Sequence, residues 1–251
     1  MTDSARFSWT VLLPVKVLAR AKSRLAVLAG DRRRDLALAL ASDTVTAVLA
    51  CPEVSRVVVV TSDPVAGPLL AALGAVVVAD EPADRSRRLD GLRPLGPLDG
   101  AEVAPDVAGL TDLGVQDLLN AALRHGAAVA AQRWPGTGLA ALTADLPALS
   151  PAELAAALRA AGAVPGGAAF VPDAAGVGTT LYAVRPGGEF LPLFGGASRA
   201  RHAAAGATEL GLAGMTGLRR DVDTPDDLRE ALAIGVGPFT RAVAADLFTD
   251  V

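Results

Sequence analysis

Cysteine and histidine are scarce in this chain: its 251 residues contain one cysteine, Cys51, and two histidines, His125 and His202. A single cysteine excludes an internal disulfide and a cage of thiolates around a metal ion. Any bound metal would therefore be held mainly by carboxylates, and such a site favours Mg²⁺ or Mn²⁺.

Aromatic residues and net positive charge are also lacking, because Phe, Trp and Tyr make up 4% of the chain and the formal charge is −4. Without a net positive charge or aromatic stacking platforms, we expect no nucleic-acid partner. No apolar run approaches the roughly 18 residues that span a bilayer, and Lys16 interrupts the first run before it could serve as a secretory core. We expect a cytoplasmic protein with small-molecule substrates and no membrane partner, and leave open whether it is a monomer or a homodimer.

Strand-like and helix-like runs alternate along the chain, which is typical of βαβ units. Strands are predicted at residues 9–15, 54–61 and 75–79, with helices at 32–49 and 66–73 between them. Hydrophobic residues make up 51% of the chain, which is enough for one sizeable core. We predict a single α/β domain over residues 1–251, with a mostly parallel sheet flanked by helices.

The alternation fails between residues 81 and 111, where charged residues are followed by many Pro and Gly. We predict a mobile insertion or lid at 81–111, and a tolerated insertion without a role is the simpler alternative. Helical periodicity resumes at Leu113, and the helix carries Asn120 beside Leu119 and Leu123.

Asp145 is the most informative acid, because it follows a short apolar strand predicted at residues 138–143. A helix is predicted to begin directly afterwards, with Ser150 as N-cap, Pro151 at its first position and Glu153 closing a capping box. Asp145 therefore lies at the carboxyl end of a strand, and ligands bind at that edge of open parallel α/β sheets.

A second pair of acids, Asp221 and Asp223, is predicted to close another short strand near residue 217. Thr224 then caps a helix that starts at Pro225. If the Asp-Val-Asp segment is extended, both carboxylates point the same way and suit one or two divalent ions. The alternative is that these acids serve only turns and caps.

Phosphate-binding groups are suggested by a basic segment after the first predicted strand, which holds Lys16, Lys22, Ser23 and Arg24. Its cations could neutralise a triphosphate, although it lacks the glycines of a P-loop. A solvated basic loop is the simpler alternative when the segment is taken alone.

Two further segments could hold anions. The turn at residues 176–179 offers backbone amides and the Thr179 hydroxyl, and Ser198 is predicted to cap a helix that carries Arg201. We expect His125 to be structural, and His202 to be an anion contact or a surface residue rather than a base. A serine hydrolase is disfavoured because the glycine that would close a nucleophile elbow after Ser198 is missing.

Taken together, these pieces resemble the phospholactate/phosphoenolpyruvate guanylyltransferase family of coenzyme F420 biosynthesis. The resemblance runs from Val11 to about Ala245 and rests on the segments Pro14-Val-Lys16, Ala21-Lys-Ser-Arg-Leu25, Asp117-Leu-Leu-Asn120, Ala144-Asp-Leu-Pro-Ala-Leu149, Gly178-Thr179, Ser198-Arg-Ala-Arg-His202 and Arg220-Asp-Val-Asp-Thr-Pro225. It implies a nucleotidyltransferase fold related to molybdenum cofactor guanylyltransferase and to Rossmann-like nucleotide-diphospho-sugar transferases.

The resemblance also implies an activity: GMP is transferred from GTP to phosphoenolpyruvate, or alternatively to 2-phospho-L-lactate or 3-phosphoglycerate, and pyrophosphate is released. One or two Mg²⁺ ions would be held by Asp145 and Asp221, with Asp223 as a further ligand. The basic residues Lys16, Lys22 and Arg24 would be catalytic by gripping the GTP phosphates. A downstream transferase of the F420 pathway is a possible partner.

The other implied contacts are divided between the acceptor and the nucleotide. The acceptor contacts are Gly178, Thr179, Gly195, Ser198 and Arg201. The nucleotide contacts are Lys16, Lys22, Ser23, Arg24 and Asn120.

Two other classes of function stay open at this point. A nucleotide-sugar glycosyltransferase would use Asp221 and Asp223 as its metal motif, although such a motif normally closes a mid-chain strand. A non-catalytic nucleotide-binding module would leave both acidic segments dispensable.

Overall fold

The computed structural model describes residues 7–15, 25–80, 107–211, 214–245 and 247. Within them, seven strands form one sheet in the order β3-β2-β1-β4-β6-β5-β7. The strands are β1 (Trp9–Pro14), β2 (Val54–Val60), β3 (Val76–Val78), β4 (Gly138–Leu142), β5 (Ala168–Pro172), β6 (Thr179–Val184) and β7 (Thr208–Glu209). Neighbouring strands are parallel except that β6 runs antiparallel to β4 and β5. The predicted α/β class with a mostly parallel sheet is confirmed.

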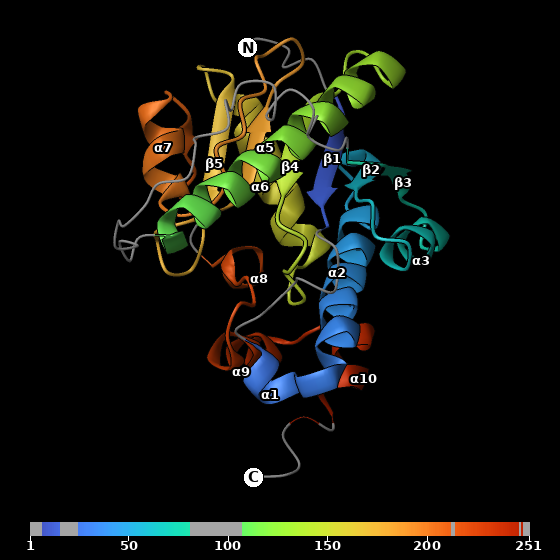
Figure 1. The fold of residues 1–251 in the computed structure, drawn as a ribbon. Helices are drawn as coiled ribbons and strands as arrows, with labels where there is room; N and C mark the ends of the chain where they lie inside the picture. Colours follow the sequence, from blue (N-terminus) through green and yellow to red (C-terminus); the bar gives the residue numbers. More distant parts are fainter. Residues whose placement is uncertain (1–6, 16–24, 81–106, 212–213, 246, 248–251) are drawn as a thin grey trace, which may run out of the picture.

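Helices cover both faces of this sheet (Figure 1). The described α-helices are α1 (Ala26–Ala29), α2 (Arg33–Leu49), α3 (Ala66–Ala72), α5 (Val107–Arg133), α6 (Pro151–Ala163), α7 (Ser198–Ala204), α8 (Thr216–Arg219), α9 (Pro225–Ile234) and α10 (Pro238–Ala244), and a short 3-10 helix, η3 (Gly30–Arg32), joins α1 to α2. Among them α5 is drawn across one face in Figure 1, and α2 and α6 pack against the other.

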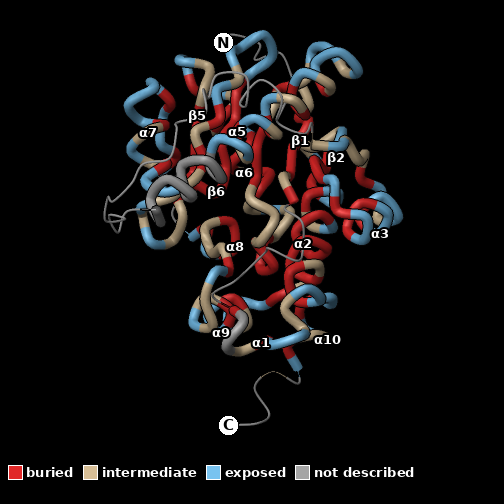
Figure 2. Tube along the Cα trace, in the orientation of Figure 1, coloured by how far each residue is buried: buried red, intermediate tan, exposed pale blue. Residues whose placement is uncertain are grey.

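The two faces are filled by alternate residues of the same strands, because successive side chains of a strand point to opposite sides. On β1, Val11 and Leu13 belong to the core cluster that contains α2 and α6 residues. Leu12, between them, joins Leu123 and Ala127 of α5 in a second cluster. Figure 2 shows the central strands β1, β4 and β6 buried along nearly their whole length, whereas the edge strand β3 is partly buried and the edge strand β7 is exposed.

A third apolar cluster lies beyond the sheet and joins α2 to the C-terminal helices. Its buried members include Leu36, Leu40, Val222, Leu228 and Val236. In Figure 1 α9 and α10 lie below the sheet, with α10 beside the first turns of α2 and α9 beside α1. Val222, between the two acids of the Asp-Val-Asp segment, is fully buried in this cluster, and this fixes where that segment runs.

The predicted capping box at the start of α6 and the predicted Thr224 cap at the start of α9 are confirmed. The Ser150 hydroxyl accepts the Glu153 N–H at 3.2 Å, and Pro151 is the first residue of α6. The Thr224 hydroxyl accepts the Asp227 N–H, also at 3.2 Å, and α9 begins at Pro225. These bonds satisfy amides at the helix starts that have no partner within the helix.

Two predictions about secondary structure are wrong: the strand before Asp221 and the start of helix α5. No strand precedes Asp221: residues Thr216–Arg219 form the short helix α8, and Asp221 follows in irregular backbone. Helix α5 begins at Val107, before the predicted Leu113, so its first residues fall inside the predicted insertion at 81–111. The rest of that insertion, residues 81–106, lies outside the described residues.

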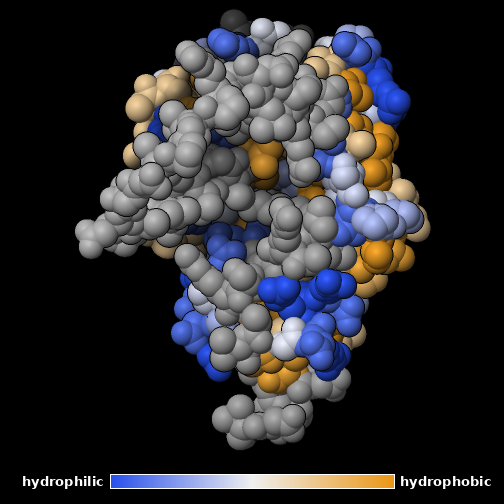
Figure 3. All heavy atoms as spheres, viewed as in Figure 1, coloured by the Kyte–Doolittle hydropathy of each residue, from blue (hydrophilic) through white to orange (hydrophobic). Residues whose placement is uncertain are grey.

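On the face drawn in Figure 3 the described surface mixes hydrophilic and apolar residues, and apolar residues lie near β3 and α3. There Val65 is 54% exposed and Leu69 is 48% exposed. Among the described helices, none combines the length and the hydropathy that crossing a membrane requires.

Candidate active site

The candidate site lies at the edge of the sheet where β1 and β4 end. Because β6 runs antiparallel to β4, its first residue, Thr179, lies at this same edge. The Thr143 N–H, just beyond β4, donates to the Thr180 carbonyl at 3.0 Å. The predicted acid site and the predicted anion site at Thr179 are therefore neighbours in the structure.

A backbone hydrogen bond brings the two acidic segments together. The Val222 N–H donates to the Asp145 carbonyl at 3.1 Å. Asp145 and Asp221 are both partly buried, whereas Asp223 is exposed. The fold thus places Asp221 beside Asp145, although the two are far apart in the sequence.

A metal ion bound by Asp145 and Asp221 would need further ligands from outside the protein. Among the described residues, no group of three or more His, Cys, Asp and Glu side chains is arranged to hold a metal ion. Mg²⁺ commonly takes one or two carboxylates and completes its six ligands with water and substrate phosphates. Asp145 and Asp221 fit that pattern in chemistry and number, and the third predicted ligand, Asp223, stays a prediction.

The segment after Asp145 is fixed by hydrogen bonds to distant elements. The Leu146 N–H donates to Thr44 Oγ1 of α2 at 2.9 Å, and the Thr44 hydroxyl donates in turn to the Leu40 carbonyl at 2.8 Å. The Gly237 N–H donates to the Pro147 carbonyl at 3.0 Å. A segment with its backbone groups paired on two sides can hold a carboxylate in one place.

Glycine is required where the segment before Asp221 crosses this loop. The Gly217 N–H donates to Glu153 Oε1 at 3.2 Å. A Cβ at residue 217 would stand 2.1 Å from the Ala148 carbonyl oxygen, a distance at which backbone must move. The close approach of these two segments therefore depends on the missing side chain.

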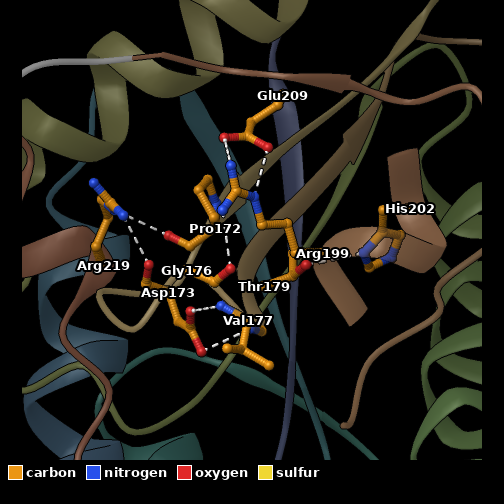
Figure 4. Close-up of polar contacts among 10 residues, drawn as sticks. Pro172, Asp173, Gly176, Val177, Thr179, Arg199, His202, Glu209 and Arg219 are labelled. Carbon is orange, nitrogen blue, oxygen red and sulfur yellow. Dashed lines mark hydrogen bonds and ion pairs between the residues drawn. The ribbon is translucent and has the colours of Figure 1, made fainter. Parts of the chain in front are cut away.

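The turn before β6 is closed by an acid that the sequence reasoning overlooked (Figure 4). The Asp173 carboxylate accepts the Val177 N–H at 2.9 Å and the Gly178 N–H at 2.8 Å. The expectation that these amides cradle an anion is therefore wrong, because Asp173 already occupies them. A Cβ at residue 178 would lie 2.5 Å from Asp173 Oδ2, which explains the glycine. A direct contact between Gly178 and the acceptor stays a prediction.

Two arginines tie this turn to neighbouring elements (Figure 4). Arg199 of α7 makes a two-pronged ion pair with Glu209, at 2.8 and 2.9 Å, and donates to the Gly176 carbonyl at 2.9 Å. Arg219 of α8 donates to the carbonyls of Pro172 and Asp173 at 3.1 and 2.8 Å. The turn is thus held from both sides and leaves Thr179 at a defined place.

Thr179 is buried and its side chain contacts His202. Thr179 Oγ1 lies 3.0 Å from His202 Nδ1, and the Leu193 N–H donates to His202 Nε2 at 3.0 Å. Burial, with a smaller contribution from neighbouring Arg201, lowers the pKa of His202 to about 4. The expectation that His202 is an anion contact or a surface residue is wrong, because the imidazole is fully buried and its lowered pKa keeps it uncharged at neutral pH.

A short loop at residues 193–195 is held by side chains from two helices. Asn120 of α5 pairs with both backbone groups of Phe194: its amide donates to the carbonyl at 3.1 Å, and its oxygen accepts the N–H at 2.9 Å. Arg201 of α7 donates to the carbonyls of Phe194 and Gly195. These two residues shape the loop that carries Gly195, and their predicted contacts with nucleotide and acceptor stay predictions.

Ser198 does not cap α7 as predicted. It is the first helical residue, its N–H donates to the Gly196 carbonyl at 2.9 Å, and Ala197 stands at the N-cap position without a side-chain bond. Ser198 is 1% exposed and lies one turn before His202. Its predicted contact with the acceptor stays untested.

The basic segment falls outside the described residues, and with it the predicted sites at Lys16, Lys22, Ser23 and Arg24. Described residues flank it on both sides. Val15 donates its N–H to the Val60 carbonyl at 3.0 Å, at the end of β1, and Leu25 is fully buried before α1.

Sequence patterns did not single out two residues that matter to the geometry, Asp173 and Thr44, nor the hydrogen-bond partners of His202. Asp173 offers a weak signal, because an Asp ahead of a glycine turn often accepts backbone amides. Thr44 offers none, since it lies within an apolar helix and its partner Leu146 is distant in the chain. The partners of His202 come from a strand and a loop that only the fold brings to α7.

Known proteins resemble this chain along nearly all of its length. It is 54% identical over 240 residues to the phosphoenolpyruvate guanylyltransferase of Streptomyces avermitilis, with 95% of each chain covered. It is 52% identical over 244 residues to the protein of the same name from Thermomonospora curvata, covering 97% of this chain and 92% of that one. No family model matches the chain.

Solved structures with low sequence identity share the fold. A nucleotidyl transferase from Methanothermobacter matches with a TM-score of 0.53 at 19% identity, covering 91% of this chain and 97% of that one. A putative nucleotide-diphospho-sugar transferase from Desulfovibrio desulfuricans matches with a TM-score of 0.51 at 14% identity, covering 90% and 96%. These likenesses concern the fold alone.

Proposed function

Because the chain belongs to the phosphoenolpyruvate guanylyltransferase family, we propose that it transfers GMP from GTP to phosphoenolpyruvate and releases pyrophosphate. The structural observation that supports this most is the hydrogen bond from the Val222 N–H to the Asp145 carbonyl. It sets two acids side by side at the edge of the sheet where α/β proteins bind ligands.

The proposed reaction is an in-line displacement at phosphorus. An oxygen of the phosphoenolpyruvate phosphate forms a bond to the α-phosphorus of GTP, and the bond from that phosphorus to the bridging oxygen of pyrophosphate breaks. The attacking phosphate is already ionised at neutral pH, so no general base is needed. This agrees with a chain of two histidines, one of which, His202, is buried and neutral.

The protein's part in such a reaction is charge neutralisation and alignment. We assign Asp145 and Asp221 to hold Mg²⁺, with Asp223 as a further candidate. Mg²⁺ would stabilise the negative charge that develops on the phosphate oxygens. The segment with Lys16, Lys22 and Arg24 would grip the triphosphate. Thr179, Gly195 and Ser198 would face the acceptor.

The resemblance to the F420 family extends this proposal to the product. Guanylylated phosphoenolpyruvate carries a new phosphoanhydride and would be an activated donor for a downstream transferase. 2-Phospho-L-lactate and 3-phosphoglycerate are the alternative acceptors, since each also joins a phosphate to a three-carbon carboxylate.

Pyrophosphate release tests the reaction and the acceptor together. The enzyme is mixed with GTP and Mg²⁺, and phosphoenolpyruvate, 2-phospho-L-lactate and 3-phosphoglycerate are offered in turn. We expect the fastest release with phosphoenolpyruvate. Absence of release with all three would refute the proposal, and a clear preference for another acid would correct the acceptor.

The metal assignment is tested by Asp145→Asn and Asp221→Asn. We expect each to lower kcat by on the order of a hundredfold or more, because loss of a metal ligand removes several kcal/mol of transition-state stabilisation. Mn²⁺ binding in the presence of GTP, followed by electron paramagnetic resonance, should weaken in parallel. Asp226→Asn is the matched control, since the Asp226 side chain on α9 is 84% exposed. Unchanged Mn²⁺ binding in Asp145→Asn would show that the assignment is wrong.

A further inference from the structure

His202 contacts two segments that the proposed function assigns to the acceptor. Its ring stacks on Tyr182 at 4.7 Å between centroids, with an interplanar angle of 16°. Phe170 stacks on the ring as well, and Phe194 meets it edge-on. One ring nitrogen faces Thr179 at the start of β6, and the other faces Leu193. Packing on three aromatic rings leaves the imidazole little freedom to turn.

The two hydrogen bonds define which nitrogen carries the proton. A backbone N–H can only donate, so the Leu193 N–H requires an unprotonated Nε2. In a neutral imidazole the proton then lies on Nδ1. The Ser198 carbonyl, one turn earlier in α7, adds a hydrogen bond that favours a proton on the ring. Both sides of the ring thus require the Nδ1–H form.

The protonated Nδ1 determines the role of the Thr179 hydroxyl. Its oxygen faces Nδ1–H at 3.0 Å and must accept, so the hydroxyl cannot use the imidazole as an acceptor for its own proton. Within the described part of the chain, no other acceptor is found for it. Thr179 therefore has a hydrogen bond to donate, which suits a carboxylate or phosphate oxygen.

We propose that His202 is a positioning residue for the phosphorylated acid: it holds Thr179 as a hydrogen-bond donor and fixes the loop at residues 193–195 beside it. The proposal rests on the proposed function and deepens it, because it names how the acceptor's anionic group is recognised. Asn120 and Arg201 hold the same loop from their own helices. His202 is the residue that links the loop to Thr179.

Kinetics separate positioning from simple packing. Thr179→Val removes the hydroxyl at nearly constant shape, and we expect KM for phosphoenolpyruvate to rise about tenfold or more, since a hydrogen bond to a charged group is lost. His202→Phe keeps a stacked ring without nitrogen atoms and should raise the same KM comparably. GTP affinity should change less than twofold in both.

The combination of the two variants and a partial rescue give the sharper test. If His202 acts through Thr179, the double variant should raise KM for phosphoenolpyruvate about as much as either single variant, because all three proteins lose the same contact. His202→Asn can place its amide N–H near the Nδ1 position and should recover most of the acceptor affinity. Additive effects, or an Asn variant as poor as His202→Phe, would overturn the proposal. His125→Asn serves as the matched control and should leave both KM values unchanged.

A spectroscopic readout is independent of turnover and needs no substitution at His202 or Thr179. With two histidines in the chain, nitrogen-15 NMR of the wild-type imidazoles can be assigned by comparison with His125→Asn. We expect His202 in the Nδ1–H form at neutral pH. An Nε2–H form overturns the positioning role even in an active enzyme. Absence of pyrophosphate release from a protein with the Nδ1–H form would instead count against the proposed function.

Discussion

Acid should destabilise this protein through His202 over a definite pH range. The folded protein holds the imidazole neutral, with its pKa lowered to about 4, whereas the unfolded chain takes up a proton near the ordinary value of 6.5. Arg201 and Tyr182 are the ionisable neighbours, and a positive charge on Arg201 opposes a second one on the ring. Below the unfolded pKa, the unfolded state therefore binds more protons than the folded state.

The direction and size follow from this difference in bound protons. The contribution of neutral His202 to the free energy of unfolding is fully present above about pH 6.5, declines as the pH falls, and is fully lost below about pH 4. At pH 5.5 the loss should be about 1.4 kcal/mol, and the full loss about 3 kcal/mol, because one pKa unit corresponds to about 1.4 kcal/mol.

The assay is urea unfolding at about pH 7.5 and about pH 5.5, in wild type and in His202→Phe. The variant loses hydrogen bonds at both pH values, so its absolute stability is lower throughout. The diagnostic quantity is the difference in the free energy of unfolding between wild type and His202→Phe. This difference should shrink by about 1.4 kcal/mol at the lower pH. His125→Asn should follow wild type. A difference that stays constant with pH would refute a buried neutral His202.

The other predictions concern the segments around Asp145, each measured by urea unfolding and pyrophosphate release. Thr44→Val leaves the Leu146 N–H without its acceptor and should cost about 1–3 kcal/mol of stability and lower kcat. Thr44→Ser should restore both quantities. Unchanged stability and kcat in Thr44→Val would show that this hydrogen bond does not hold the segment after Asp145. Gly217→Ala forces a methyl group against the Ala148 carbonyl and should lower the free energy of unfolding more than Thr44→Val does. Near-normal stability would show that the segment at Ala148 can move aside at little cost. The buried Asp43 carboxylate accepts two amides at the start of α10, at 3.1 and 2.7 Å. Asp43→Ala should cost about 2 kcal/mol or more, with KM values unchanged if that helix only supports the fold.

Local features account for the parts of the fold that the sequence predicts well. The strands at Trp9–Pro14 and Gly138–Leu142 are apolar runs bounded by residues that end them. The starts of α6 and α9 follow from Ser150 and Thr224, whose capping bonds span only three residues. Prediction failed where local preference was weak: the residues before Asp221 form a single helical turn, although their pattern suggested a strand.

Contacts between distant segments account for what the sequence leaves open in the site. An acid after a strand is a candidate ligand, but its partner depends on which segment returns to that edge. Here the buried Val222 anchors the returning segment in an apolar cluster, and its N–H then meets Asp145. Likewise the sequence predicted that the amides of Val177 and Gly178 could bind an anion, but in the fold both donate to the Asp173 carboxylate.

The amino-acid sequence by itself determined the α/β class, the capped helices and the acid that follows β4, because these depend on hydrogen bonds and apolar periodicity within a few residues. Tertiary structure decided that Asp145 lies beside Asp221, that Thr179 reaches the same edge on the antiparallel β6, and that His202 is buried between Thr179 and Leu193. Such meetings depend on strand order and burial, which are set by the packing of the whole chain and not by any one stretch of it.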